Sequence, residues 1–272
     1  MKRAAPSQCA VGRRAAAAIM TTLLLFTVAE SASAADIPLD QRRSGYADLG
    51  RDSKAMQDDD TGNPATLWVL DGEVLWNQKA GVVNRACADC HGDATASMKG
   101  VAARYPAYSP ARNGPIDLEQ RINLCRTEYQ RATPLSYESR DLLALTAYVG
   151  RQSRGMAIAE ASDERLKPFI ETGRTLFNRR LGQLNLSCAQ CHDDNWGKRL
   201  AGSFLPQGHP NGYPLYRLEW QGVGSLQRRL RNCLIGMRAE PYAFGSSEFV
   251  ALELFLMQRA RGMTIETPAV RP

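Results

Sequence analysis

The chain has 272 residues, of which 44% are hydrophobic and 23% are charged, and its formal net charge is +6 at pH 7. This length is enough for two modest domains, and the composition is ordinary for a globular protein. The sequence contains no basic tract suited to a nucleic acid backbone, so we expect no nucleic acid partner.

The first 34 residues are typical of a secretory signal peptide. Basic residues precede an apolar stretch at 15–28 that is too short to span a bilayer comfortably, and Ala32-Ser33-Ala34 matches an A-x-A cleavage pattern. We predict that residues 1–34 are removed near Ala34 on export to the periplasm; the alternative is an uncleaved anchor. Cleavage removes four basic residues and one acidic residue, so the net charge falls to about +3. The mature chain is expected to have no membrane span.

Residues 35–64 are predicted to form an N-terminal extension, and a first module follows at 65–160. This module contains the segment C-A-D-C-H, in which Cys87 and Cys90 are separated by two residues and His91 follows directly. C-x-x-C-H is the attachment motif of haem c. Its two thiols reach two vinyl groups on one edge of the porphyrin, and the histidine that follows binds the iron. We therefore predict a covalently attached haem c with His91 as an axial ligand.

The second module, at 161–272, repeats the motif as C-A-Q-C-H. Here Cys188 and Cys191 are the predicted attachment sites and His192 is the predicted axial ligand. A structural zinc site or a redox-active cysteine pair would not need a histidine after each pair, so these alternatives explain less of the pattern. The cofactor prediction is two haem c groups.

The similarity of the two modules extends beyond the motifs. At an offset of 101 residues the pattern G-x-x-L-[WF]-N recurs at 72–77 and 173–178, and we predict an N-terminal helix at each place. At an offset of 107, apolar residues with helical spacing recur at 140–151 and 247–259, where we predict the C-terminal helices that cross them. The larger offset predicts a longer loop in the second module, which we place at 198–221 because Gly and Pro are frequent there.

The fold class expected from these patterns is all-α. Two cytochrome c-like modules are related by internal duplication, and an N-terminal extension precedes them.

Each module contains one further cysteine, Cys125 or Cys233, at nearly equivalent places after the motifs. Three interpretations are open: a Cys125–Cys233 disulfide, which suits an exported protein; two buried free thiols; or a thiolate on the sixth position of each iron. The repeated position favours ligation, with Met98 and Met237 as the alternative ligands. A thiolate would lower the haem potential and is also the nucleophilic form of cysteine.

The sequence resembles the SoxA subunits of the thiosulfate-oxidising Sox system over nearly all of the mature chain. The matching features are Asp58-Asp59 and Asn63-Pro64 in the extension, both haem motifs and, most specifically, Tyr213-Pro214-Leu215-Tyr216-Arg217, Ser225-Leu226, Arg229, Cys233, Met237-Arg238, Gly245-Ser246 and Leu252-Glu253-Leu254.

This resemblance implies an enzyme subunit, an L-cysteine S-thiosulfotransferase that forms a heterodimer with a SoxX-type mono-haem cytochrome c. Such an enzyme couples thiosulfate oxidatively to a cysteine of a SoxYZ-type sulfur carrier. The product is a cysteine S-thiosulfonate, and two electrons pass to a cytochrome c. The alternative is a simple periplasmic di-haem electron-transfer cytochrome, which needs no reactive thiol.

The resemblance also implies roles for individual residues. Cys233, opposite His192, is implied to be the catalytic residue, through a cysteine persulfide, and Arg229 is implied to hold the anion. Arg238 also flanks Cys233 and is predicted to contribute to the substrate site, because a planar guanidinium suits an oxyanion.

Overall fold

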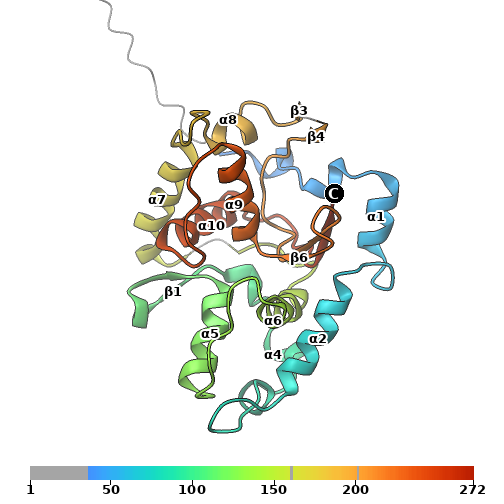
Figure 1. Ribbon diagram of the computed structural model, residues 1–272, viewed down its shortest axis with the longest axis vertical. Coiled ribbons are helices and arrows are strands. Elements are labelled where there is room, and N and C mark those ends of the chain that lie inside the picture. Colours follow the sequence, from blue (N-terminus) through green and yellow to red (C-terminus); the bar gives the residue numbers. More distant parts are fainter. Residues whose placement is uncertain (1–35, 160–161, 201) are drawn as a thin grey trace, which may run out of the picture. The chain divides into compact units, whose positions relative to one another are not determined.

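Two pairs of crossed helices form the frame of the protein. The computed structural model describes residues 36–159, 162–200 and 202–272. The four frame helices are α2 (Thr66–Asn77), α6 (Arg140–Arg151), α7 (Lys167–Asn178) and α10 (Ser247–Arg259). Helix α2 packs on α6, and α7 packs on α10 (Figure 1). The predicted N-terminal and C-terminal helices of both modules are therefore confirmed. The predicted signal peptide, including Ala34, lies outside the described residues.

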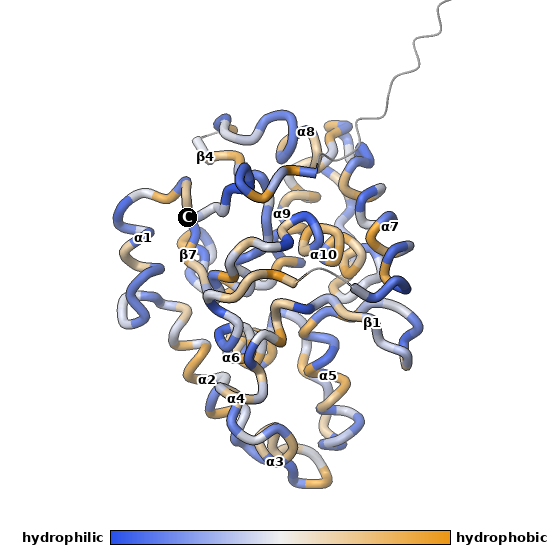
Figure 2. The backbone as a smooth tube through the Cα atoms, turned by 180° about the vertical axis from the view of Figure 1, so that it is seen from behind, coloured by the Kyte–Doolittle hydropathy of each residue, from blue (hydrophilic) through white to orange (hydrophobic). Residues whose placement is uncertain are grey.

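The two C-terminal helices begin at equivalent serine caps. The Ser139 hydroxyl accepts a hydrogen bond from the backbone N–H of Leu142 at the start of α6, and Ser246 accepts one from Phe249 at the start of α10. A capping hydroxyl satisfies an N–H group that has no partner within the helix. Both helices are then buried along most of their length, and Figure 2 shows α10 as a largely apolar segment surrounded by other elements.

Each pair of helices crosses at a glycine. A Cβ atom on Gly72 would lie 2.6 Å from the Cβ of Tyr148 and closer still to the carbonyl oxygen of Ala144 on α6. A Cβ atom on Gly173 would meet Phe255 and Ala251 of α10 in the same way, at 2.6 Å from the Phe255 Cβ. Only a residue without a side chain permits this approach of two backbones. The glycine that opens each G-x-x-L-[WF]-N pattern is therefore a packing residue.

Shorter helices carry the cysteines. The haem motifs lie on α3 (Ala88–His91) and α8 (Cys188–His192), while Cys125 lies on α5 (Leu118–Glu128) and Cys233 on α9 (Leu226–Gly236). Two further helices are α1 (Arg51–Asp58) in the extension and α4 (Ala94–Ser97) after the first motif. Single 3₁₀ turns complete the helical part at Leu39–Gln41, Gly45–Asp48, Ala102–Arg104, Pro110–Arg112 and Glu164–Leu166.

The prediction of a strictly all-α fold is wrong, because the chain also forms short strands. They are β1 (Ala107–Ser109), β2 (Gly114–Ile116), β3 (Arg199–Leu200), β4 (Ser203–Phe204), β5 (Leu215–Arg217), β6 (Gly222–Gly224) and β7 (Ala269–Arg271). Strands β1 and β2 pair, as do β3 and β4, and a three-stranded sheet has the order β6-β5-β7 with β5 and β7 parallel. Strands of two or three residues are too short to leave a hydrophobic alternation in the sequence. The segment at 198–221, predicted as a loop, contains three of them.

The strands extend the internal duplication. Each residue of the β5–β6 hairpin lies 108 positions after its counterpart in the β1–β2 hairpin. In both modules this hairpin directly precedes the helix with the third cysteine.

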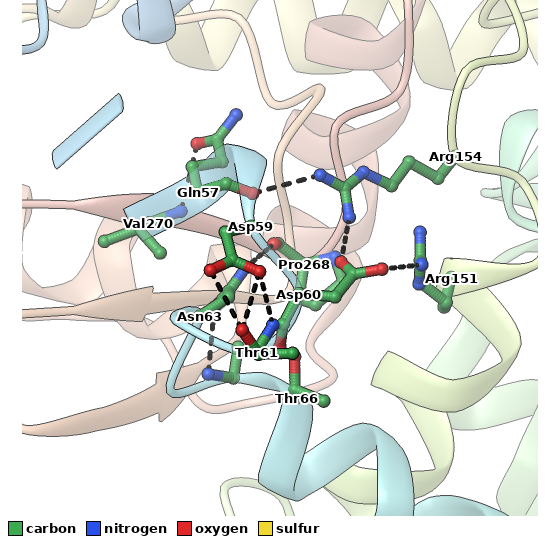
Figure 3. Close-up of polar contacts among 11 residues, drawn as sticks. Gln57, Asp59, Asp60, Thr61, Asn63, Thr66, Arg151, Arg154, Pro268 and Val270 are labelled. Atoms are coloured by element: carbon green, nitrogen blue, oxygen red, sulfur yellow. Dashed lines mark hydrogen bonds and ion pairs between the residues drawn. The ribbon is translucent and has the colours of Figure 1, made fainter. Parts of the chain in front are cut away.

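The N-terminal extension is tied to the C-terminal strand and to the end of α6 (Figure 3). The side-chain oxygen of Gln57 accepts a hydrogen bond from the backbone N–H of Val270 at 3.0 Å, and the amide of buried Asn63 donates to the carbonyl of Pro268 at 3.0 Å. Asp60 pairs with Arg154 at 2.7 Å and also with Arg151. The extension thus joins the first module to the C-terminal end of the second. None of the helices in the described part of the chain has the length and apolar character needed to cross a membrane.

Replacing either crossing glycine by alanine is expected to destabilise the protein by about 1–3 kcal/mol, because the added Cβ forces two packed backbones apart. Gly236→Ala is the matched control: it adds the same atom to helix α9, where a Cβ meets nothing within 4 Å. Denaturant unfolding of Gly72→Ala, Gly173→Ala and Gly236→Ala measures the three free energies. Equal free energies of unfolding for all three variants would contradict the close approach of the helix backbones at Gly72 and Gly173.

Candidate active site

The second haem motif lies on a short helix with a defined start. The Ser187 hydroxyl accepts a hydrogen bond from the backbone N–H of Gln190, and the Gln190 side chain accepts one from the backbone of Ser187, which is a capping box. Helix α8 therefore begins at Cys188, and one turn brings Cys191 and His192 to fixed positions beside it. Cys188 packs against the apolar core of the α7–α10 pair.

The imidazole of His192 is oriented by the loop that follows it. Its Nδ1 atom lies 2.7 Å from the carbonyl oxygen of Pro206. Because a carbonyl only accepts, Nδ1 carries a proton, which leaves Nε2 as the nitrogen available to a metal ion. Gly208, whose φ of +77° favours glycine, packs so close to the ring that an added Cβ would lie 3.0 Å from the His192 Cγ. A hydrogen bond from Nδ1 to a backbone carbonyl, like this one to Pro206, is typical of histidines that bind metals through Nε2.

Cys233 faces His192 from helix α9. Burial by itself raises the pKa of the Cys233 thiol, but a hydrogen bond with the His192 side chain and the positive charges of Arg229 and Arg217 outweigh it and lower the pKa below its usual value. The surroundings of Cys233 therefore favour the thiolate, which is both the ligand form and the nucleophilic form of cysteine.

Arg217 is a member of this site that the sequence analysis did not assign. It lies on β5, and its charge acts on both Cys233 and Arg229. Burial and the charge of Arg229 lower the pKa of the Arg217 guanidinium, while its Nε is buried without a hydrogen bond partner. Glu219 pairs with it at 3.2 Å from an exposed position. The charges of two guanidinium groups therefore act on one sulfur, and the Nε–H of Arg217 has no acceptor.

The other arginines near Cys233 in the sequence point elsewhere. Arg231 donates to the backbone carbonyl of Tyr242 and stacks on the Phe244 ring at 4.7 Å. Arg238 is exposed beyond the end of α9, with a φ of +54°, and its backbone carbonyl accepts a hydrogen bond from Gln183. Of the residues predicted to bind substrate, the structure brings Arg229 next to Cys233 and leaves Arg238 at the surface.

The residues of this site fit a haem c group. An apolar pocket contains both Cys188 and Cys233 among leucine, methionine and tyrosine side chains, as the two faces of a porphyrin require. The pocket residues are Leu176, Leu181, Cys188, Leu230, Cys233, Leu234, Met237, Tyr242 and Leu252. Cys188 and Cys191 would attach the group, while His192 and Cys233 would hold the iron. Met237, the alternative ligand, is buried in the core cluster with Phe249.

The first module repeats much of this arrangement. Trp76 packs against the His91 ring at 5.7 Å, and its indole N–H donates to the Gly92 carbonyl at 3.0 Å. Burial raises the pKa of the Cys125 thiol, while Arg121, four residues earlier on α5, lowers it. Cys125 also interacts electrostatically with Cys90 of the motif. Each third cysteine therefore lies near the motif of its own module.

One difference between the two sites lies in the hairpin before the third cysteine. Tyr105 interacts with Arg121 and Cys125 just as Tyr213 interacts with Arg229 and Cys233. In the duplicated hairpins, however, the residue equivalent to Arg217 is Ser109, at the end of β1. The first site therefore lacks the hairpin guanidinium that acts on Cys233 in the second.

No disulfide joins any of the six cysteines from Cys87 to Cys233 in the described part of the chain. Cys125 and Cys233 are thus not joined to each other. This agrees with the ligand and free-thiol interpretations and does not support the disulfide.

These features define the class of the protein. A C-x-x-C-H motif on a short helix, placed beside crossed N-terminal and C-terminal helices, characterises a c-type cytochrome. A family model described as "SoxA/TsdA, cytochrome c domain" matches residues 71–158 and again residues 172–265. The chain belongs to this SoxA/TsdA cytochrome c family, and haem c is its cofactor.

Known relatives are similar over most of their length. The L-cysteine S-thiosulfotransferase subunit SoxA of Pseudaminobacter salicylatoxidans is 39% identical over 236 residues, which is 86% of this chain and 82% of that protein. The subunit of the same name from Rhodovulum sulfidophilum is 37% identical over 85% of this chain and 81% of its own length. The crystal structure of SoxXA from P. pantotrophus matches with a TM-score of 0.82 and 34% identity, covering 85% of this chain and 87% of that one. The resemblance to SoxA is confirmed.

Proposed function

We propose that this chain is the SoxA-type subunit of a periplasmic L-cysteine S-thiosulfotransferase, which couples thiosulfate oxidatively to a cysteine of a SoxYZ-type carrier. The observation that carries the proposal is that the charges of both Arg229 and Arg217 act on the buried thiol of Cys233. Thiosulfate is a dianion, and two guanidinium groups supply matching charge and planar donors beside the sulfur that must react.

The chain is organised for this role as two modules with unequal sites. Residues 65–160 would carry one haem c on Cys87 and Cys90, and residues 161–272 a second on Cys188 and Cys191. The axial ligands would be His91 with Cys125 in the first module and His192 with Cys233 in the second. Residues 1–34 would act as the signal peptide and 35–64 as the extension. When bound, haem supplies a one-electron acceptor close to the reacting sulfur.

The bond changes can be written for Cys233 as the sulfur that carries the intermediate. The Cys233 thiolate and the outer sulfur of thiosulfate form one S–S bond and lose two electrons, which leaves a sulfonate at the end of the persulfide-type chain. A carrier thiolate then attacks the same outer sulfur, the bond to Cys233 breaks, and Cys233 leaves again as a thiolate. The product is the S-thiosulfonate of the carrier cysteine.

The arginines contribute to both steps. Before the first, they hold the dianion next to a thiolate, which would otherwise repel it. During the second, their charge stabilises the Cys233 thiolate as a leaving group, in keeping with the lowered pKa of this thiol. The electrons would leave through the partner, a SoxX-type mono-haem cytochrome c, in agreement with the SoxXA complex of the similar structure.

A simple di-haem electron carrier is the competing function. It would use the same haem motifs and axial ligands, but it does not explain why the β5–β6 hairpin places an arginine near Cys233 where the first module has a serine. The different residues at Ser109 and Arg217 therefore favour a substrate site in the second module.

Cys233→Ala is expected to abolish the coupling of thiosulfate to the carrier, because the sulfur that carries the intermediate is lost, while both haems remain attached through their C-x-x-C-H motifs. Cys125→Ala is the matched control and is expected to retain most of the activity. The assay follows the mass of the carrier protein after incubation with thiosulfate and an oxidised cytochrome c. Full activity of Cys233→Ala would contradict the proposed function.

Arg217→Ser, which gives the second module the residue of the first, is expected to lower kcat/KM for thiosulfate roughly 10–100-fold, since a hydrogen bond to a charged group contributes about 1.5–3 kcal/mol. Arg51→Ser is the control, because the Arg51 side chain is 96% exposed in the extension. The same assay of Arg238→Ser tests whether this surface arginine also contacts the anion. An unchanged kcat/KM in Arg217→Ser would contradict the assignment of Arg217 to the thiosulfate-binding site.

A further inference from the structure

A cavity of about 100 Å³ lies where the two modules meet. The first module lines it with Asp117, the cap of α5, and with Glu119 of α5 and Thr146 of α6. The second module lines it with Tyr213 and with Glu253 of α10. This volume has room for several water molecules, and the carboxyl and hydroxyl groups in its lining can hydrogen-bond to them. The cavity contains neither haem motif, and the proposed thiosulfate reaction gives it no role.

Three carboxyl groups from both modules gather at the cavity. Asp117 is buried at the start of α5, where it accepts hydrogen bonds from the backbone N–H of Gln120 at 2.6 Å and from the Gln227 amide at 2.9 Å. Gln227 is fully buried on α9 and also interacts with Glu253. Its side-chain oxygen accepts a hydrogen bond from the backbone N–H of Gly245 at 2.7 Å. Asp117 and Glu253 are thus linked across the module boundary through one glutamine.

Glu119 is the group whose hydrogen bonds are incomplete. It is 5% exposed, and its Oε1 atom is buried without a partner. A carboxyl oxygen left without a partner in a protein interior costs free energy, whereas water in the cavity would satisfy it. Its position in the cavity lining therefore indicates that the cavity is hydrated.

The surroundings of these carboxyl groups disfavour negative charge. Burial raises the pKa of Glu119 well above its usual value, and the charges of Asp117, Glu253 and Glu138 raise it further. Burial and Asp117 raise the pKa of Glu253, and burial raises that of Asp117 to about 6. Other groups face the cluster from neighbouring elements. Tyr137 donates to Asp117 at 3.3 Å, Arg228 pairs with Glu138 at 3.7 Å, and Tyr105 and Tyr213 line the cavity walls.

We propose that this inter-module cavity is a binding site for protons and water, in which Glu119 and Glu253 keep their protons at neutral pH beside the carboxylate of Asp117. The un-ionised carboxyl groups act as hydrogen bond donors to one another or to the water between them. The site belongs to both modules, so it exists only while they are docked.

A metal cation is the other occupant that three carboxyl groups suggest. The described residues, however, contain no group of three His, Cys, Asp or Glu side chains arranged to hold a metal ion. Asp117 already accepts bonds from a backbone N–H, an amide and a phenol, which leaves it few free lone pairs. Protons satisfy the cluster without requiring its oxygens to converge on one point.

The site makes the joint between the modules sensitive to pH. Because the pKa values of these carboxyl groups are higher in the folded protein than in the unfolded chain, the folded protein binds more protons. The contribution of these protons to the free energy of unfolding is fully present below about pH 4. It is lost in part as the pH rises through about 6, where Asp117 ionises. It falls further at higher pH, as the two glutamates ionise. Ionisation then places like charges on α5 and α10. It also disturbs Gln227, which lies two residues before Arg229 on the helix that carries Cys233.

Glu119→Gln, Glu253→Gln and the double variant test the proposal in the haem-loaded protein. Glutamine keeps the shape of a carboxyl group without a titratable proton. The infrared spectrum of the wild-type protein at pH 7 is expected to contain a carbonyl band of un-ionised carboxylic acid, which each variant reduces. The melting temperature of the wild type is expected to fall more steeply between pH 6 and 9 than that of the double variant. Glu171→Gln, at a position with a side chain 67% exposed, should change neither quantity.

Two results would overturn the proposal. The first is a wild-type infrared spectrum at pH 7 without any band of un-ionised carboxylic acid, which needs no variant. The second is a rise in melting temperature on adding K⁺ or Ca²⁺ to the wild type that Glu119→Gln lacks, which would identify a cation site.

Discussion

The structure depends on the approach of two helix backbones at Gly72 and at Gly173. Because no side chain separates the crossed helices, the segments attached to their ends are held at fixed distances from each other. The haem motif follows the first helix of each pair, and the helix with the third cysteine precedes the second. Cys125 and Cys233 reach equivalent places because the same frame is built twice. Neither needs a bond to the other to be held there.

Within this common frame the two sites have diverged at one hairpin position. Both keep a tyrosine, an arginine four residues before the cysteine, and the cysteine itself. Only the second has an arginine, Arg217, where the first has Ser109. The first site is thus an internal reference for the second. It shows what the frame provides without the hairpin arginine, and under the proposed function that arginine binds the thiosulfate dianion. The cavity of Asp117, Glu119 and Glu253 lies between the two sites and joins their supporting helices.

The sequence predicts the parts of this structure that occur twice or that extend over several helical turns. The crossed helices and both haem motifs are recognisable because each contains several residues at fixed spacing. The strands are not, since two or three residues leave no alternation and their pairing is decided by tertiary contacts. Arg217 was missed for the same reason: only the β5–β6 hairpin brings it to Cys233. Arg238 is close to Cys233 in the sequence but lies at the surface, because α9 ends before it.

Iron K-edge X-ray absorption of the haem-loaded protein tests the central claim, that each third cysteine is placed to meet the iron of its own module. The account predicts one sulfur atom in the first coordination shell of every iron, and loss of half of that sulfur signal when Cys233 is replaced. Iron coordinated by nitrogen alone, together with a mass map that finds Cys125 and Cys233 in one disulfide, would contradict it.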